Sequence, residues 1–142
     1  MPDKLFTVLL ADDEYWVRES LRAMLAWPTY GMDFLPPAAD GEEALKRLSE
    51  EPVDILITDI NMPYISGLEL ITKAKAISPR TVILVLSGYS DYEYVRQALV
   101  EGALDYLLKP IAKTKLLEVL NRAIEQLLKR QQEQQQMRQM QL

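Results

Sequence analysis

Polar residues follow four short apolar runs of this chain, and they are the first candidates for chemistry. Asp59 comes directly after VDILIT, and the adjacent acids Asp12 and Asp13 come directly after the run LFTVLLA. Ser87 follows VILVL, and Lys109 follows LDYLL. Such runs are typical of strands buried on both faces of a parallel sheet. Because parallel strands end at the same edge of a sheet, we expect these five side chains to lie close together.

Three carboxylates at one edge need positive charge. At ~5 Å and an effective dielectric constant of ~20, each pair of like charges costs roughly 3 kcal/mol, which Lys109 alone cannot offset. The chain has no cysteine and no histidine, so a metal must have oxygen ligands, and this favours Mg²⁺. A carboxylate beside Mg²⁺, a hydroxyl and an ammonium group suits phosphoryl transfer, with Asp59 as nucleophile and Ser87 and Lys109 at the phosphoryl oxygens. The residues therefore predict a phospho-acceptor site.

The elements that must position these residues alternate along the chain. Apolar runs predict strands, and apolar residues at helical spacing between polar starts and Gly or Pro stops predict helices. The predicted strands are 5–10, 34–38, 53–58, 82–86 and 104–108, and the predicted helices are 14–27, 41–50, 68–77, 90–101 and 114–129. Strict alternation predicts an α/β fold, a (βα)5 doubly wound parallel sheet with helices on both faces, of flavodoxin-like order 2-1-3-4-5. Pro36 and Pro37 place the second strand at an edge.

Composition agrees with one compact domain. The 142 residues are 49% hydrophobic and 26% charged, which suits a single core, expected at 1–129, followed by a polar helical linker or tail at 130–142. No apolar run reaches the length of a membrane span and the N-terminus is unlike a signal peptide, so we expect a soluble, cytoplasmic protein without a membrane partner. A net charge of −5 argues against direct nucleic-acid binding by this chain.

Four motifs in order carry a family resemblance. LLADDE, ITDINMPYISG, VLSGYSDYEYV and ALDYLLKP resemble the receiver domain of two-component response regulators. In that family the acid pair, here Asp12 and Asp13, holds Mg²⁺ together with the phospho-acceptor Asp59 and the backbone carbonyl of Asn61. The Lys109-Pro110 step resembles the family's cis peptide bond.

The same resemblance implies roles for further residues and for partners. Ser87 and Lys109 match positions that contact the phosphoryl group, and Ser87 and Tyr106 match the switch residues. The phosphodonor would be a histidine kinase, and the chain would be a signalling phospho-acceptor, not an enzyme with a separate substrate. It would catalyse its own phosphotransfer and a slow autodephosphorylation, for which Tyr89 is a candidate shield against water.

The resemblance also implies an output. Phosphorylation would alter the surface formed by the fourth helix, last strand and fifth helix, and so control an output module, most naturally in transcription. SGYSDYEYVRQAL followed by DYLLKP is most similar to receivers attached to AraC-type DNA-binding domains, so DNA contact would belong to a C-terminal domain outside this chain. Met137, Met140 and Leu142 would begin a seam for homodimerisation on phosphorylation, unless 130–142 is only a frayed tail.

Other functions fit the residues less well. A hydrolase of the haloacid-dehalogenase type also uses a nucleophilic Asp with Mg²⁺, but its nucleophile lies on the first strand, whereas here the acid pair comes first. A dinucleotide-binding module needs a glycine-rich turn after the first strand, and ADDEYW has no glycine. An inactive scaffold of the receiver type would have lost an acid, the hydroxyl or the lysine, and all are present. Asp40, Asp91 and Asp105 are interpreted as cap or turn residues.

Overall fold

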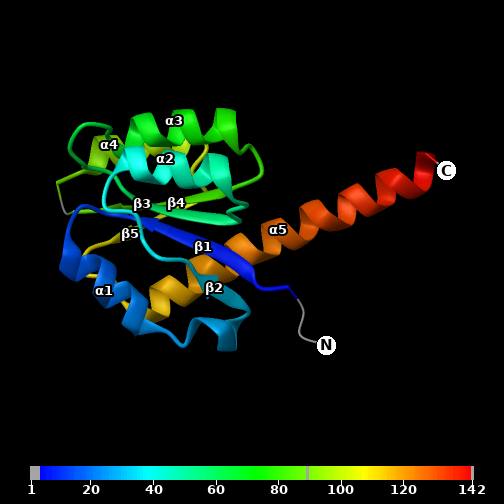
Figure 1. Cartoon of the computed structure of the whole chain (residues 1–142), viewed down its shortest axis with the longest axis horizontal. Coiled ribbons are helices and arrows are strands. Elements are labelled where there is room, and N and C mark those ends of the chain that lie inside the picture. Colours follow the sequence, from blue (N-terminus) through cyan, green and yellow to red (C-terminus); the bar gives the residue numbers. More distant parts are fainter. Residues whose placement is uncertain (1–3, 89, 142) are drawn as a thin grey trace.

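The sheet has the predicted number of strands in the predicted order. The computed structural model describes residues 4–88 and 90–141, and five parallel strands lie side by side in the order β2-β1-β3-β4-β5 (Figure 1). The strands are β1 Phe6–Ala11, β2 Met32–Phe34, β3 Ile55–Asp59, β4 Val82–Ser87 and β5 Asp105–Leu108. Every neighbouring pair is parallel, so the carboxyl ends of all five strands meet at one edge.

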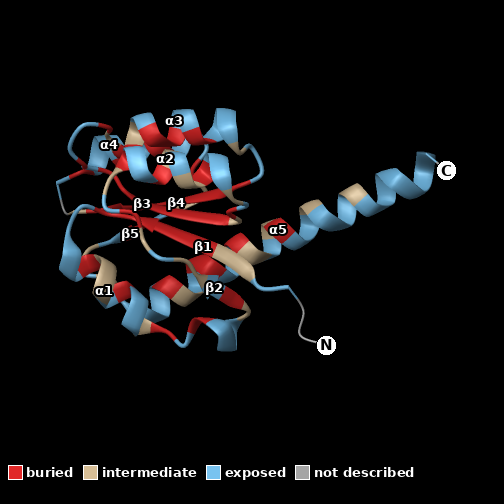
Figure 2. Ribbon diagram, viewed as in Figure 1, coloured by how far each residue is buried: buried red, intermediate tan, exposed pale blue. Residues whose placement is uncertain are grey.

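Helices cover both faces of the sheet (Figure 1). α1 and α5 lie on one face, and α2, α3 and α4 lie on the other. The helices are α1 Tyr15–Met24, α2 Gly41–Glu50, α3 Gly67–Ile77, α4 Tyr92–Val100 and α5 Lys113–Gln141, with a 3₁₀ turn, η1, at Trp27–Tyr30. Successive strand residues point to opposite faces: Val8 and Leu10 join the core under α1 and α5, and Leu9 joins the core under the other helices. Figure 2 shows the strands buried between these layers.

The second strand was predicted in the wrong place. It was expected at 34–38 and instead spans Met32–Phe34, although its position at the sheet edge is confirmed. The reason is that Pro36 and Pro37 have no N–H for the ladder. The chain still follows β1 beyond the prolines, since the Ala38 N–H donates to the Leu10 carbonyl at 2.7 Å.

Two further expectations need correction. The helix predicted at 14–27 ends at Met24, and Trp27 turns into the core, where its indole N–H donates to the Leu21 carbonyl at 3.2 Å. Asp105 is not a turn residue: it lies in β5 and forms an ion pair with Arg122 of α5. Asp40 is the N-cap of α2 as predicted, and its carboxylate accepts from the Glu43 N–H at 2.8 Å.

The last helix is much longer than the domain it packs on. α5 buries Leu116, Val119, Leu120, Ala123 and Leu127, and then continues through the polar segment to Gln141. This second half projects away from the sheet and is mostly exposed (Figures 1 and 2). Within the described part of the chain, no helix is both long enough and apolar enough to cross a membrane.

Gly67 is required by the close approach of α3 to the end of β3. A methyl group built on Gly67 would overlap the carbonyl oxygen of Asp59 and approach Ile60 Cα at 2.7 Å. We therefore expect Gly67→Ala to lower the free energy of unfolding by about 1–3 kcal/mol, the usual cost of overpacking. Urea denaturation measures this loss. At Gly88 the same methyl would make only ordinary contact, 3.4 Å from an Asp91 oxygen, so Gly88→Ala is the control and should differ little from wild type; equal losses would contradict the explanation.

Candidate phospho-acceptor site

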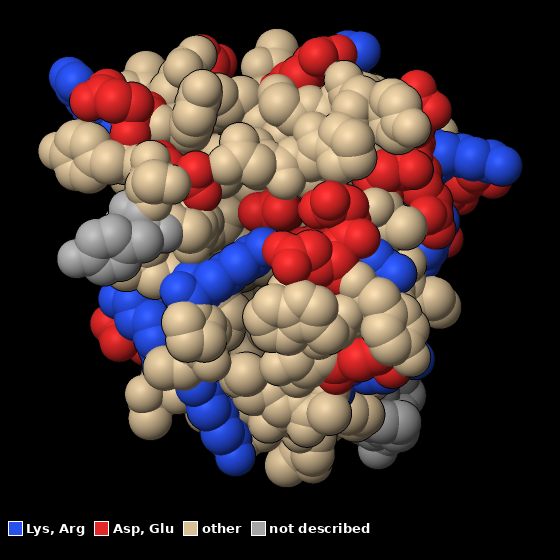
Figure 3. All heavy atoms as spheres, turned by 90° about the vertical axis from the view of Figure 1, so that its left-hand side faces the viewer, with Lys and Arg blue, Asp and Glu red and all other residues tan. Residues whose placement is uncertain are grey.

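The predicted site residues meet at the carboxyl edge of the sheet. Asp12 follows β1, Asp59 ends β3, Ser87 ends β4, and Lys109 follows β5. Asp12, Asp59 and Ser87 are buried, and the Lys109 side chain extends from the end of edge strand β5 to the two aspartates. Figure 3 views this face and shows carboxylates gathered at its centre with basic side chains against them.

Lys109 holds the cluster together electrostatically. Its Nζ lies 3.1 Å from Asp12 Oδ2, 3.4 Å from Asp59 Oδ1 and 3.3 Å from Glu14 Oε1. Lys109 Nζ is close enough to Asp12 Oδ2 to form an ion pair, but the two groups are not aligned for a hydrogen bond. One ammonium group therefore serves three carboxylates, and negative charge is left over.

Burial and the neighbouring charges together shift the pKa values of the site residues. Burial raises the pKa of Asp59 to about 6, and the neighbouring Asp12 charge adds to the effect, while Lys109 opposes it. Burial likewise raises the pKa of Asp12. For Lys109, burial lowers the pKa, but the Asp12 and Asp59 charges outweigh it and the net shift is upward. At neutral pH Asp59 is ionised and is thus available as a nucleophile, though at an electrostatic cost.

The structure brings Glu14 into the cluster in the place expected for Asp13. Carboxylate oxygens of Asp12, Glu14 and Asp59 lie within 4.8 Å of one another, whereas the Asp13 side chain is exposed. Both Glu14 oxygens are engaged, one by Lys109 and the other by the Trp16 indole N–H at 3.0 Å. All these donors are oxygens and their charge exceeds that of Lys109, so the residues fit a hard divalent cation such as Mg²⁺.

Ser87 and Asn61 complete the site. The Ser87 hydroxyl is buried and has no hydrogen-bond partner among the described residues, as expected of a donor that waits for an oxygen acceptor. Asn61 follows Asp59 by two residues, and its side-chain amide donates to Asp91 Oδ1 at 2.7 Å. Asp91 is the N-cap residue of α4, as predicted, but its side chain makes no capping bond with the helix. Sequence patterns gave no sign of this contact.

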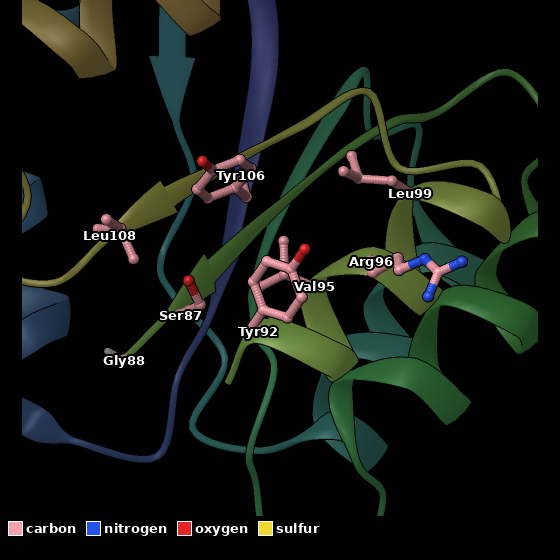
Figure 4. Close-up of a pocket in the computed structure, with 8 residues that line it drawn as sticks. All are labelled: Ser87, Gly88, Tyr92, Val95, Arg96, Leu99, Tyr106 and Leu108. Carbon is pink, nitrogen blue, oxygen red and sulfur yellow. The ribbon is translucent and has the colours of Figure 1, made fainter. Parts of the chain in front are cut away.

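A pocket lies between the site and the face formed by α4 and β5. It has a volume of about 370 Å³. Figure 4 shows Tyr106 and Leu108 of β5 on one side, residues of α4 on the other, and Ser87 and Gly88 at its end. The Tyr106 side chain borders this pocket while 37% of the residue is exposed. Tyr89, the expected shield, lies outside the described residues.

Comparison with known proteins identifies the family. A family model, the response regulator receiver domain, matches residues 8–121. The chain is 36% identical over 123 residues to the uncharacterized transcriptional regulatory protein YesN of Bacillus subtilis, covering 87% of this chain and 33% of that protein. It is 34% identical over 127 residues to the transcriptional regulatory protein HptR of Staphylococcus aureus, covering 89% and 50%. The chain thus spans a third to a half of these relatives.

Solved structures agree. The receiver domain of AraT, a response regulator from Geobacillus stearothermophilus, superposes with a TM-score of 0.80 at 36% identity, covering 92% of this chain and 98% of that one. A two-component transcriptional regulator AraC from Clostridium phytofermentans gives 0.82 at 32% identity, covering 89% and 98%. This chain belongs to the response regulator receiver domain family, whose members are signalling phospho-acceptors. The Lys109-Pro110 bond is cis, as the resemblance implied.

The raised pKa of Asp59 predicts a distinctive pH dependence without metal. The folded protein holds the Asp59 proton up to a pKa of about 6, against 3.8 for the ordinary carboxyl. Between these two pKa values the folded state therefore binds more protons than the unfolded state. As a result, the free energy of unfolding falls as pH rises through this window. Relative to Asp59→Asn, which cannot ionise, wild type should lose on the order of 2–3 kcal/mol of unfolding free energy from pH 4 to pH 7.

Urea unfolding in the presence of a chelator, repeated across this pH range on both proteins, makes the measurement. Since the other acids are common to the two chains, the difference between the curves isolates the site. A difference that stays constant, or that favours wild type as pH rises, would show that ionised Asp59 is not a destabilising group.

Proposed function

We propose that Asp59 accepts a phosphoryl group from the phosphohistidine of a kinase. The Asp59 carboxylate forms a new P–O bond as the P–N bond to the donor breaks, and the donor histidine leaves. The observation that supports this most directly is the geometry of Lys109, whose Nζ lies 3.4 Å from the nucleophile. The ammonium group is placed to neutralise phosphoryl oxygens, and the unpartnered Ser87 hydroxyl is a ready donor to one of them.

We assign the metal site to Asp12, Asp13, Asp59 and the backbone carbonyl of Asn61. Mg²⁺, when bound, would neutralise part of the negative charge that gathers between the carboxylates and the phosphoryl group. Asp13 is included because it directly follows Asp12 and its exposed side chain can turn towards a cation. Glu14 already has Lys109 and Trp16 as partners.

Mass spectrometry after incubation with acetyl phosphate and Mg²⁺ tests the acceptor. We expect one phosphoryl group on wild type, none on Asp59→Asn, and none when a chelator replaces Mg²⁺. Autodephosphorylation is expected to be slow, with a phosphoform that lasts many minutes. Equal labelling of wild type and Asp59→Asn would refute the assignment.

The same assay separates the two acids that compete for the metal role. Asp13→Asn should strongly reduce the rate of labelling and the Mg²⁺ affinity. Glu14→Gln is the matched control, since it removes one charge from the next residue, and we expect a smaller effect. The reverse order would assign the metal to the cluster of Asp12, Glu14 and Asp59.

Phosphorylation is proposed to act through the surface of α4, β5 and α5. Tyr106 borders the pocket beside Ser87, so a Ser87 hydroxyl drawn to the phosphoryl group leaves room for the ring to turn inwards. The Tyr106 N–H donates to Asp105, and Asp105 pairs with Arg122, which connects β5 to α5. The proposed outputs are a homodimer and, through a C-terminal DNA-binding domain beyond Leu142, control of transcription in the cytoplasm. Leu142 itself lies outside the described residues.

Sedimentation velocity tests the dimer. A population shift requires the dimer to bind the phosphoform better than the free form, so beryllofluoride with Mg²⁺ should raise the mass of the intact chain at tens of micromolar. Tyr106→Ala, and a chain ending at Lys129 that lacks Met137, should respond weakly. If the intact chain stays monomeric with beryllofluoride bound, dimerisation through this domain is not the output.

A further inference from the structure

A buried carboxylate beside the site has no part in the function proposed above. Asp91 has only 8% of its surface exposed. Its Oδ1 accepts a hydrogen bond from the Asn61 side-chain amide, and its Oδ2 accepts one from the Gly88 N–H, both at 2.7 Å. The Asp91 carboxylate therefore fastens two partners to each other.

Both partners adjoin the reacting groups. Asn61 lies two residues after Asp59, in the loop between β3 and α3, and Gly88 directly follows Ser87, in the loop between β4 and α4. The carboxylate thus joins the loop that follows the proposed acceptor to the loop that follows the proposed phosphoryl contact. Asp91 lies 30 residues from Asn61, so this contact exists only in the folded chain.

We propose that Asp91 is a positioning residue: it ties the loop carrying the proposed metal ligand Asn61 to the loop that begins at Gly88, directly after Ser87. The inference rests on the proposed Mg²⁺ site. Asn61 would bind the metal through its backbone carbonyl, and its side chain, held by Asp91, fixes the orientation of that residue. Contacts one step removed from a metal commonly change metal affinity by about 10–100-fold when they are lost.

Four variants distinguish the hydrogen-bonded link through Asp91 from a simple effect of its negative charge. Asp91→Ala removes both the negative charge and the acceptors. Asp91→Asn removes the charge but keeps the clamp, because its oxygen can accept from Gly88 while its amide donates to an Asn61 side chain rotated to present its oxygen. Asn61→Ala removes the same contact from the other side and leaves the backbone carbonyl in place. Glu93→Ala removes an exposed acid two residues further along α4 and is the control for charge.

Isothermal titration with Mg²⁺ on the intact chain measures the effect. We expect Asp91→Ala and Asn61→Ala each to weaken Mg²⁺ binding by about tenfold, and the double variant to be no weaker than either. Asp91→Asn and Glu93→Ala should stay near wild type. The inference would be overturned if the losses of Mg²⁺ affinity in the double variant were additive, or if Asp91→Asn bound Mg²⁺ as weakly as Asp91→Ala. Either result would mean that the hydrogen bond between Asp91 and Asn61 does not determine the Mg²⁺ affinity.

A second readout needs no metal. Amide hydrogen exchange at Gly88, followed by NMR in the presence of a chelator, should be roughly tenfold faster in Asp91→Ala than in wild type. It should remain slow in Asn61→Ala, where the bond to Gly88 survives. Unchanged exchange in Asp91→Ala would overturn the clamp. A wild type that binds no Mg²⁺ would overturn the proposed site together with this inference, whereas normal Mg²⁺ binding by Asp91→Ala would overturn this inference alone.

Discussion

The burial of two carboxylates beside a single ammonium group is the constraint on which the rest of this structure depends. Asp12 and Asp59 are both buried and both contact Lys109 Nζ. An ionised carboxylate is costly to bury without a cation. The cation here, Lys109, lies 97 residues after Asp12 in the sequence. Only a fold that aligns the ends of β1, β3 and β5 can bring the three together. The parallel sheet and its two apolar layers supply that alignment, and the excess negative charge that remains makes the site receptive to a divalent cation.

Much of the fold could be predicted because the central strands are buried on both faces. β3 and β4 are continuous apolar runs that end in a polar residue, and their boundaries differ from the prediction by only one or two positions. The bounds of β2 could not be predicted in this way, because an edge strand of only three residues has a weak sequence pattern. The apolar residues near Pro36 lie in the segment that follows β2, not in the strand itself. At Trp27 the apolar spacing continued past the end of the helix because that side chain packs into the same core from a 3₁₀ turn.

The sequence was enough to predict the strand-end residues of the candidate site, but not all the contacts that loop side chains make there. Position at a strand end was enough to select Asp12, Asp59, Ser87 and Lys109, because backbone geometry alone brings them to one edge. The direction of a loop side chain depends on neighbours from other loops, and no local pattern encodes it. For this reason Glu14, and not Asp13, contacts Lys109. In the same way, the N-cap position of Asp91 could be predicted, but the contacts of its carboxylate with Asn61 and Gly88 could not.

α5 gives the domain a way to carry a local change over a long distance. Its first half is fixed by buried residues up to Leu127 and by the ion pair of Arg122 with Asp105. Arg130 then donates to the Arg80 carbonyl at 2.8 Å, and Gln134, one turn later, is still half-buried. The helix then projects into solvent, where Met137 is 62% exposed. In the output proposed above, a movement of β5 that shifts Asp105 would turn the projecting half with it, because α5 is one continuous helix from Lys113 to Gln141. Since α5 buries no residue after Leu127, the orientation of its polar second half follows mainly from the half that lies against the sheet.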